Sequence, residues 1–400
     1  NRMNRKTIIK VICSILLIMQ SYSICSASVL FEEDSEEMED EIIITEDREI
    51  NDVDNSLVLD KLRVNARNAI AIDGTTRQIL YEQNCYEVVP MASTTKILTA
   101  LVALNEGDLD RELTVTKNAA SIRGSKVGYK AGETIKLREL LYGLMLKSGN
   151  DAAITIAEGL GGSIENFSKI MNHYATSLGL TTSHFETPHG LDSQKHYSSA
   201  YDLAILTAKA MENDTFKEIC GEKLITQDKY NFTREYQNIN KILWKIPDAN
   251  GVKTGYTGGA GKCLVSSVKH EGRNIIIVVL NCSDRWNVTE KIFNYVCTNY
   301  DFKKESNSEI IKSNAISNLG SIVEEADFQY GSKEKANLEV EVFKPIMNVL
   351  KGDIIGKISL KDEGNEVLRQ EIRCNKNISK DKYDTVLSMS HSDKEDTSES

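Results

Sequence analysis

This chain of 400 residues lacks several features, and each absence excludes a class of protein. The net charge is −11, so the surplus of basic residues that binds polyanions is missing. Neither nucleic acid nor an anionic membrane surface is therefore expected as the main partner. The eight cysteines include no Cys-x-x-Cys pair, which argues against a zinc site or thioredoxin-like chemistry. His196 has no partners at metal-binding spacing, and no metal or cofactor is predicted.

A long hydrophobic run is also missing. The N-terminus is basic, and the apolar run from Val11 to Met19 is shorter than the roughly 20 residues that a membrane-spanning helix needs. Small residues follow it, up to Ala27. This pattern is typical of a signal peptide over residues 1–27 and predicts an exported protein. The next segment, residues 28–57, is acidic, and from residue 31 it contains neither glycine nor proline, which predicts a solvated linker.

Further along the chain, the spacing of the apolar residues alternates between the period of two that is typical of strands and the period of 3.6 that is typical of helices. A β-hairpin is predicted over 69–81, three strands over 251–256, 262–268 and 274–280, and helices over 93–104, 137–146, 151–159, 199–211 and 288–296. Strands that precede and follow a helical middle indicate an α+β fold, with an antiparallel sheet flanked by helices and a helical subdomain. We assign residues 58–300 to this catalytic domain.

The remaining residues differ in composition. Residues 301–375 are charged and strand-rich, with period-two alternation over 337–342, and predict a small C-terminal β domain of accessory function. Residues 376–400 form a polar tail that we expect to be disordered. The six cysteines after the signal lie mostly in apolar surroundings and are interpreted as buried thiols.

One Ser-x-x-Lys sequence, Ser93-Thr94-Thr95-Lys96, stands at the predicted start of a helix. Residues i and i+3 share one face of a helix, so the amine of Lys96 can lie beside the hydroxyl of Ser93. A serine hydroxyl is a poor nucleophile until a base takes its proton. Lys96 can be that base if burial and a second cation lower its pKa, and Lys253 is the candidate for the second cation.

Two later segments make this chemistry more specific. Ser148-Gly149-Asn150 interrupts a helix, so that Ser148 can relay a proton while Asn150 holds Lys96 and the substrate. Lys253-Thr254-Gly255 lies on a predicted strand and offers a cation and a hydroxyl to a substrate carboxylate. Gly255 lets a substrate approach the strand closely, and the N–H of Tyr256 is the candidate to complete an oxyanion hole.

A Ser-His-Asp triad built from His189 and Asp192 is the competing interpretation of the same serine. It is disfavoured because Lys96 already supplies a base and no Gly-x-Ser-x-Gly elbow surrounds Ser93. Ser-x-x-Lys spacing also recurs at Ser266, Ser332 and Ser379, where no companion motifs are present. His189 and His196 are therefore interpreted as loop residues.

With its flanks, the chain resembles the low-molecular-mass penicillin-binding proteins that are D-alanyl-D-alanine carboxypeptidases. The stretches that carry the resemblance are 92–96, 147–152, 187–192 and 251–257, with weaker similarity at 343–346 and 351–356. The resemblance implies the penicillin-binding and β-lactamase-like transpeptidase fold. It also implies removal of the terminal D-alanine from peptidoglycan pentapeptide stems, through an acyl-enzyme on Ser93 with Lys96 as base. β-Lactams would acylate the same serine.

Two other functions stay open at this point. A class A-like β-lactamase needs a deacylating glutamate, and Glu186 lacks the Leu-Asn that follows that residue in the β-lactamases. A catalytically silent wall-binding protein on the same fold is the second alternative. We expect location outside the cytoplasm, in the cell wall or on the outer face of the membrane, and leave peripheral membrane association open.

Overall fold

The computed structural model describes residues 62–314, 316–333 and 337–389. The predicted signal peptide (1–27) and acidic linker (28–57) lie outside the described residues. In the part that is described, no helix is both long enough and apolar enough to cross a membrane.

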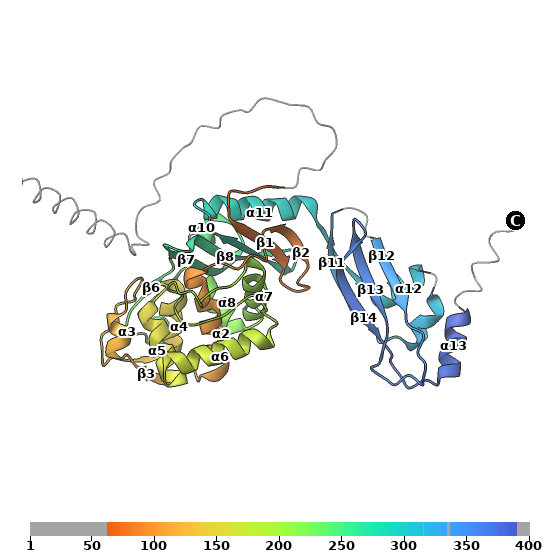
Figure 1. The fold of residues 1–400 in the computed structure, drawn as a ribbon, viewed down its shortest axis with the longest axis horizontal. Helices are drawn as coiled ribbons and strands as arrows, with labels where there is room; N and C mark the ends of the chain where they lie inside the picture. The colour runs from red at the N-terminus through yellow and green to blue at the C-terminus, as the bar shows by residue number, and fades with distance from the viewer. Residues whose placement is uncertain (1–61, 315, 334–336, 390–400) are drawn as a thin grey trace, which may run out of the picture.

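A five-stranded antiparallel sheet forms the centre of the first region (Figure 1). Its strand order is β2-β1-β9-β8-β7, so that β7 is an edge strand. The strands are β1 (Asn68–Asp73), β2 (Ile79–Gln83), β7 (Ala249–Thr257), β8 (Gly261–His270) and β9 (Arg273–Leu280). The predicted hairpin and the three later strands are confirmed, and with them the antiparallel sheet.

The two faces of the sheet pack against different helices because successive side chains of a strand point to opposite faces. In β9, Ile275 and Ile277 pack in the cluster that contains the buried side chains of α11 (Arg285–Asn299). Ile276 and Val278 belong instead to the larger cluster of the helical subdomain. The nearly continuous apolar run of β9 therefore reflects a strand that is buried on both faces.

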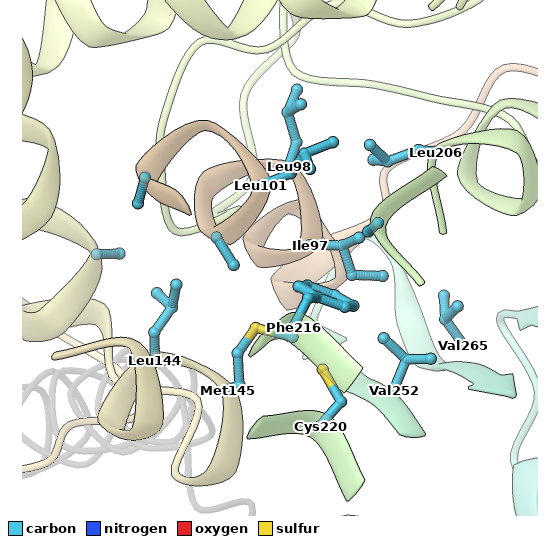
Figure 2. Close-up of a cluster of buried hydrophobic side chains, with 14 of the residues drawn as sticks. Ile97, Leu98, Leu101, Leu144, Met145, Leu206, Phe216, Cys220, Val252 and Val265 are labelled. Carbon is cyan, nitrogen blue, oxygen red and sulfur yellow. The ribbon is translucent and has the colours of Figure 1, made fainter. Parts of the chain in front are cut away.

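The second face is covered by the helical subdomain, in which η1 (Ala92–Thr95) leads directly into α2 (Lys96–Glu106). Figure 2 shows Ile97, Leu98 and Leu101 of α2 surrounded by apolar side chains from α4, α7, α8, β7 and β8. The other helices are α3 (Lys117–Ser121), α4 (Leu137–Leu146), α5 (Asn150–Gly161), α6 (Ile164–Ser177), α7 (Ala200–Ala210), α8 (Asp214–Gly221), α9 (Gln227–Tyr230) and α10 (Ile242–Lys245). Two short ladders join β3 (Glu112–Thr114) to β4 (Thr134–Lys136) and β5 (Leu224–Ile225) to β6 (Tyr236–Gln237).

Helix α6 was not predicted, although it is one of the longer helices of the described residues. Only Phe167, Met171 and Ala175 are fully buried on it, at a spacing of four residues, and most of its other residues are polar. The side chain of Ser163 caps its first turn by accepting from the amide of Asn166. A narrow apolar stripe of this kind is easily overlooked in a polar segment.

The second region, from residue 301, holds its own core. Its strands are β10 (Asp301–Ser306), paired with β11 (Asp327–Ser332), and β12 (Asn337–Val342), β13 (Ile354–Asp362) and β14 (Asn365–Arg373), which form a three-stranded sheet. The helical elements are α12 (Asn307–Ser313), η2 (Ser317–Ile322) and α13 (Lys380–Met389). The division into domains at residue 300 stays a proposal.

The prediction of a disordered tail from residue 376 is wrong for residues 380–389, which form α13. Tyr383 and Leu387 lie one turn apart and are buried in the core of the second region. The hydroxyl of Tyr383 also donates to the carbonyl oxygen of Phe343 at 3.0 Å. These buried side chains and hydrogen bonds dock the helix, even though most of its residues are polar.

A reciprocal pair of hydrogen bonds connects the two regions. The side-chain amide of Gln78, directly before β2, donates to the carbonyl oxygen of Gly331 at 2.7 Å and accepts from its N–H at 2.8 Å. Both bonds are buried. The position of β11 against the catalytic sheet is therefore fixed by a paired contact rather than by the chain connection alone.

The cysteines after the signal lie mainly in the interior. Cys220, Cys263, Cys282 and Cys374 are buried thiols outside any disulfide, and Cys297 is half-buried. Burial raises the pKa of the Cys263 and Cys282 thiols to about 11. The interpretation as buried thiols is confirmed for these four. For Cys263 and Cys282 the raised pKa suppresses the reactive thiolate at neutral pH.

Candidate active site

The turn that carries Ser93 is a 3-10 turn rather than the first turn of an α-helix. Threonine hydroxyls fix it from within, because Thr94 Oγ1 donates to the carbonyl oxygen of Met91 at 2.6 Å and Thr95 Oγ1 to that of Ala92 at 2.8 Å. Ala92 has a φ of +51°, in the left-handed region that costs an alanine about 1–2 kcal/mol. Strain of this kind persists only where the surroundings hold it in place.

The amine of Lys96 is completely buried and lies among four oxygen atoms. Its Nζ is 2.7 Å from Ser93 Oγ, 2.7 Å from Asn150 Oδ1, 3.0 Å from the His189 carbonyl oxygen and 3.4 Å from Ser148 Oγ. The amide and carbonyl oxygens can only accept hydrogen bonds. A neutral amine that uses its two N–H bonds there keeps its lone pair for the proton of Ser93.

Ser148 and Asn150 lie where α4 ends and α5 begins. Ser148 is fully buried and has a φ of +57°, and this left-handed residue turns the chain between the two helices. Asn150 is oriented by its own bonds, since its Nδ2 donates to the Arg123 carbonyl oxygen at 2.9 Å and its N–H to that of Ser125 at 2.8 Å. These contacts aim Oδ1 at Lys96.

Asp151 holds the segment that faces this helix start. Its buried carboxylate accepts from the backbone N–H groups of Val127, Gly128, Tyr129 and Ala152, at 2.8–3.1 Å. A carboxylate at the start of a helix also benefits from the helix dipole. Sequence reasoning missed this residue, although its position directly after Asn150 is a usable signal.

Strand β7 brings the third motif against the turn of Ser93. Lys253 and Thr254 are buried, and Lys253 Nζ lies 2.8 Å from the Thr254 carbonyl oxygen and 3.4 Å from Thr254 Oγ1. Tyr256 is the most exposed of the four residues predicted here, at 37%. The role of Lys253 as a second cation and that of the Tyr256 N–H in an oxyanion hole stay predictions.

A close contact with the turn of Ser93 explains why residue 255 is a glycine, and this contact was not predicted from the sequence. A Cβ added there would lie 3.1 Å from the Ser93 nitrogen and 3.2 Å from that of Thr94. The turn of the nucleophile itself is thus what approaches the strand closely. Arg285 also contacts this glycine, since its Nη1 donates to the Gly255 carbonyl oxygen at 3.0 Å.

The loop of His189 and Asp192 does not form a triad with Ser93. Asp192 accepts from Thr257 Oγ1 at 2.7 Å and from the Gly259 N–H at 2.9 Å, which ties the loop to the end of β7. His189 accepts from the Leu191 N–H through Nδ1, and burial followed by the charge of Lys96 lowers its pKa to about 3. The contribution of His189 to the site is its backbone carbonyl, which no side-chain pattern could reveal.

No group of three or more histidine, cysteine, aspartate or glutamate side chains among the described residues is arranged to hold a metal ion. What this geometry can do is transfer an acyl group to a serine, using a buried lysine as base.

Comparison with known families agrees with this geometry. The sequence profile of the S11 peptidases, D-alanyl-D-alanine carboxypeptidases, matches residues 55–284. The chain belongs to this family. It is accordingly a serine peptidase of the D-alanyl-D-alanine carboxypeptidase type, with the α+β fold of the low-molecular-mass penicillin-binding proteins.

Individual relatives extend the match. The D-alanyl-D-alanine carboxypeptidase DacF of Bacillus subtilis is 29% identical over 82% of this chain and 90% of its own length. DacC of Escherichia coli is 36% identical over 58% of this chain, which spans 61% of that protein. The match to DacF therefore covers more of the chain than the family profile does.

Solved structures show the same fold. The D-alanyl-D-alanine carboxypeptidase from Mycobacterium tuberculosis has a TM-score of 0.56 and 32% identity, and covers 61% of this chain and 95% of its own. The carboxypeptidase DacD from Francisella tularensis has a TM-score of 0.60 over 82% of this chain and 97% of its own. At 24% identity the second structure bears on the fold alone.

Proposed function

We propose that this S11 peptidase removes the terminal D-alanine from peptidoglycan pentapeptide stems through an acyl-enzyme on Ser93. The observation that carries the proposal is the set of contacts around Lys96 Nζ, in which the hydroxyl of Ser93 lies at 2.7 Å, closer than that of Ser148 at 3.4 Å. Lys96 takes the proton of Ser93 as Oγ attacks the carbonyl carbon of the penultimate D-alanine. A tetrahedral oxyanion forms and requires hydrogen-bond donors.

Collapse of this intermediate breaks the peptide bond. The nitrogen of the terminal D-alanine takes up the proton held by Lys96, and Ser148, 3.4 Å from that amine, lies where it can relay the proton. Terminal D-alanine leaves and an ester remains on Ser93. Lys96 then takes a proton from water, whose oxygen attacks the ester, and the proton returns to Ser93 as the shortened stem departs.

Substrate binding is assigned to β7. Lys253 and Thr254 offer a cation and a hydroxyl to the carboxylate of the terminal D-alanine. Because β7 is an edge strand, an extended stem peptide can add to it through backbone hydrogen bonds. The Tyr256 N–H is the proposed oxyanion donor at the end of this strand.

β-Lactams are proposed as inhibitors that acylate Ser93 and are released slowly. Rapid release would require a second base for water, and Glu186 is the residue that a β-lactamase would need. The Glu186 carboxylate instead accepts a hydrogen bond from Ser193, and its backbone N–H donates to His196 Nδ1 at 3.0 Å. This geometry favours a carboxypeptidase over a class A-like β-lactamase.

The deciding experiment measures release of D-alanine from diacetyl-lysyl-D-alanyl-D-alanine by the wild type and by Ser93→Ala. We expect release by the wild type and none above background by the variant. Fluorescent penicillin should label only the wild type, and a protein that stays unlabelled would be the silent wall-binding alternative. Rapid, repeated turnover of a chromogenic cephalosporin would instead support the β-lactamase.

Action outside the cytoplasm follows from the substrate, and export rests on the N-terminal pattern of residues 1–27. We also propose peripheral attachment to the membrane through the loop 343–352. This loop holds Ile346, Met347 and Leu350, whose exposed fractions (87%, 68% and 57%) are the largest among the exposed large hydrophobic side chains of the described residues. The loop contains Lys344 and Lys351 and no acidic residue, which suits a lipid headgroup layer.

Sedimentation with vesicles of phosphatidylethanolamine and phosphatidylglycerol tests this attachment on the mature chain. The double variant Ile346→Glu and Met347→Glu should lose most of the bound fraction. Leu224→Glu, at another exposed apolar side chain far from this loop in the sequence, is the matched control and should bind like the wild type. Equal binding by all three proteins would exclude the loop as the contact.

A further inference from the structure

His196 belongs to none of the three motifs, yet it contacts the turn of the nucleophile. The side chain is buried, and its Nε2 lies 2.7 Å from Thr95 Oγ1. Its Nδ1 accepts from the N–H of Glu186 at 3.0 Å and from that of Thr187 at 3.4 Å. Two backbone donors at Nδ1 leave no room for a proton there, so Nε2 carries the hydrogen of the neutral ring.

The hydrogen at Nε2 also determines which group donates in the next two hydrogen bonds. Nε2–H donates to Thr95 Oγ1, and Thr95 Oγ1 donates in turn to the Ala92 carbonyl oxygen at 2.8 Å. Ala92 is the left-handed residue directly before Ser93. The ring of His196 therefore stabilises, through one hydroxyl, the strained peptide that sets the position of the nucleophile.

The same ring also holds the loop that supplies an acceptor to the base. Glu186 and Thr187 begin the segment that runs to His189, whose carbonyl oxygen lies 3.0 Å from Lys96 Nζ. At the end of this segment Gly190 lies against Ala92, since an added Cβ there would fall 2.0 Å from the Ala92 carbonyl oxygen. His196 thus joins the turn of Ser93 to the loop that contacts Lys96.

We propose that His196 is a positioning residue for acylation, holding Ser93 and Lys96 at reacting distance through Thr95 without touching the substrate. The inference rests on the proposed function, because it concerns the rate at which Ser93 is acylated. It predicts that changes at His196 and Thr95 lower the acylation rate constant while initial, non-covalent binding is preserved.

The surroundings of the ring keep it neutral. The pKa of His196 is lowered to about 4, chiefly by burial, with Glu186 and Asp192 opposing and His184 and Lys96 adding to the shift. Phe185 packs edge-on against the ring and excludes water from that side. Protonation would place a second hydrogen at Nδ1, against the two N–H groups that now donate to it.

Matched substitutions distinguish the role of Nδ1 from that of Nε2. His196→Asn keeps an acceptor near Nδ1 and loses the donor to Thr95, whereas His196→Gln keeps a donor near Nε2. Thr95→Val removes the hydroxyl at nearly constant volume, and Thr95→Ser keeps it. His173→Asn, at an exposed histidine of α6, is the control for histidine loss in general.

Stopped-flow acylation by a fluorescent penicillin gives the acylation rate constant and the initial dissociation constant separately. We expect His196→Asn and Thr95→Val each to slow acylation by roughly tenfold or more, with an unchanged dissociation constant, as one hydrogen bond predicts. Thr95→Ser and His196→Gln should recover most of the rate. The double variant should be no slower than either single one, because both remove the same bond.

Wild-type rates in His196→Asn and Thr95→Val, or multiplicative losses in the double variant, would overturn the inference. So would a loss confined to the dissociation constant. Thermal unfolding of each variant identifies proteins that fail to fold, and Thr95→Val then carries the test if His196→Asn is one of them. If the wild type itself is not acylated, the proposed function fails rather than this inference.

Discussion

Gly255 lies so close to Ser93 that an added Cβ would be 3.1 Å from the Ser93 nitrogen, within the range where a neighbour must give way. Gly255→Ala should therefore shift the nucleophile turn and slow acylation by about tenfold to a hundredfold, with small loss of stability. Gly258→Ala is the matched control on the same chain segment, since a Cβ there would meet nothing within 4 Å. Acylation rates measured with fluorescent penicillin check the pair, and equal rates would show that the turn tolerates the contact.

Asn150 Oδ1 accepts from Lys96, and a carboxylate in its place would favour the ammonium form of the lysine. Asn150→Asp should raise the pKa of Lys96, so acylation would need a higher pH. The pH dependence shifts upward because Lys96 can accept the proton of Ser93 only when its amine is neutral. The rising limb of the pH–rate profile should move to higher pH, and an unmoved limb with a lower plateau would show that Asn150 acts by position alone.

Asp151 is expected to matter for both stability and rate. Asp151→Asn removes the charge from a buried group that four backbone N–H groups satisfy, and it sets an amide against some of them. The loss should be about 1–3 kcal/mol in the free energy of unfolding, with slower acylation because the 125–129 segment also contacts Asn150. Urea unfolding at neutral pH and the acylation assay measure the two effects, and an unchanged unfolding free energy would contradict the assigned role.

Acid should destabilise the protein through its buried histidines. The folded-state pKa values of His189 and His196, about 3 and about 4, lie below the ordinary value of 6.5, so the unfolded chain binds protons first as pH falls. The stability they contribute is complete above pH 6.5 and is lost as pH falls toward 3 for His189 and toward 4 for His196, at about 1.4 kcal/mol per pH unit for each histidine.

Comparison of variants isolates this effect from that of the carboxylates. The stability difference between the wild type and His196→Gln should shrink by about 2 kcal/mol between pH 7 and pH 5. His173→Asn, at an exposed position, is the control for the loss of a histidine in general. Urea unfolding at several pH values measures the differences, and parallel curves for wild type and His196→Gln would show that the ring is not held neutral.

Regular elements could be predicted where the burial pattern is simple. The helix over 137–146 and the strand over 337–342 have the predicted bounds, because their apolar residues follow one period from end to end. Helix α6 and helix α13 were missed, since each fully buries only two or three side chains and most of its other residues are polar. Tertiary contacts, rather than local preference, stabilise such helices.

The residues of the active site could likewise be predicted from the sequence only in part. The spacing of Ser93 and Lys96 predicts their contact, and the motif of Ser148 and Asn150 predicts which side chains join them. Backbone groups cannot be identified in this way, so the His189 carbonyl oxygen was missed. His196 was interpreted as an ordinary loop residue, because its partner Thr95 lies 101 positions away in the sequence.

The contact between Gln78 and Gly331 has a consequence for which part of the cell wall the enzyme can reach. A side-chain amide that both donates to and accepts from one glycine backbone imitates a further rung of a β-ladder, so the contact sets direction as well as distance. Figure 1 shows the second region as a separate unit beside the first. If the loop 343–352 rests on the membrane as proposed, Ser93 stands at one fixed height above it. The enzyme would then trim stems within one layer of the wall rather than throughout its thickness.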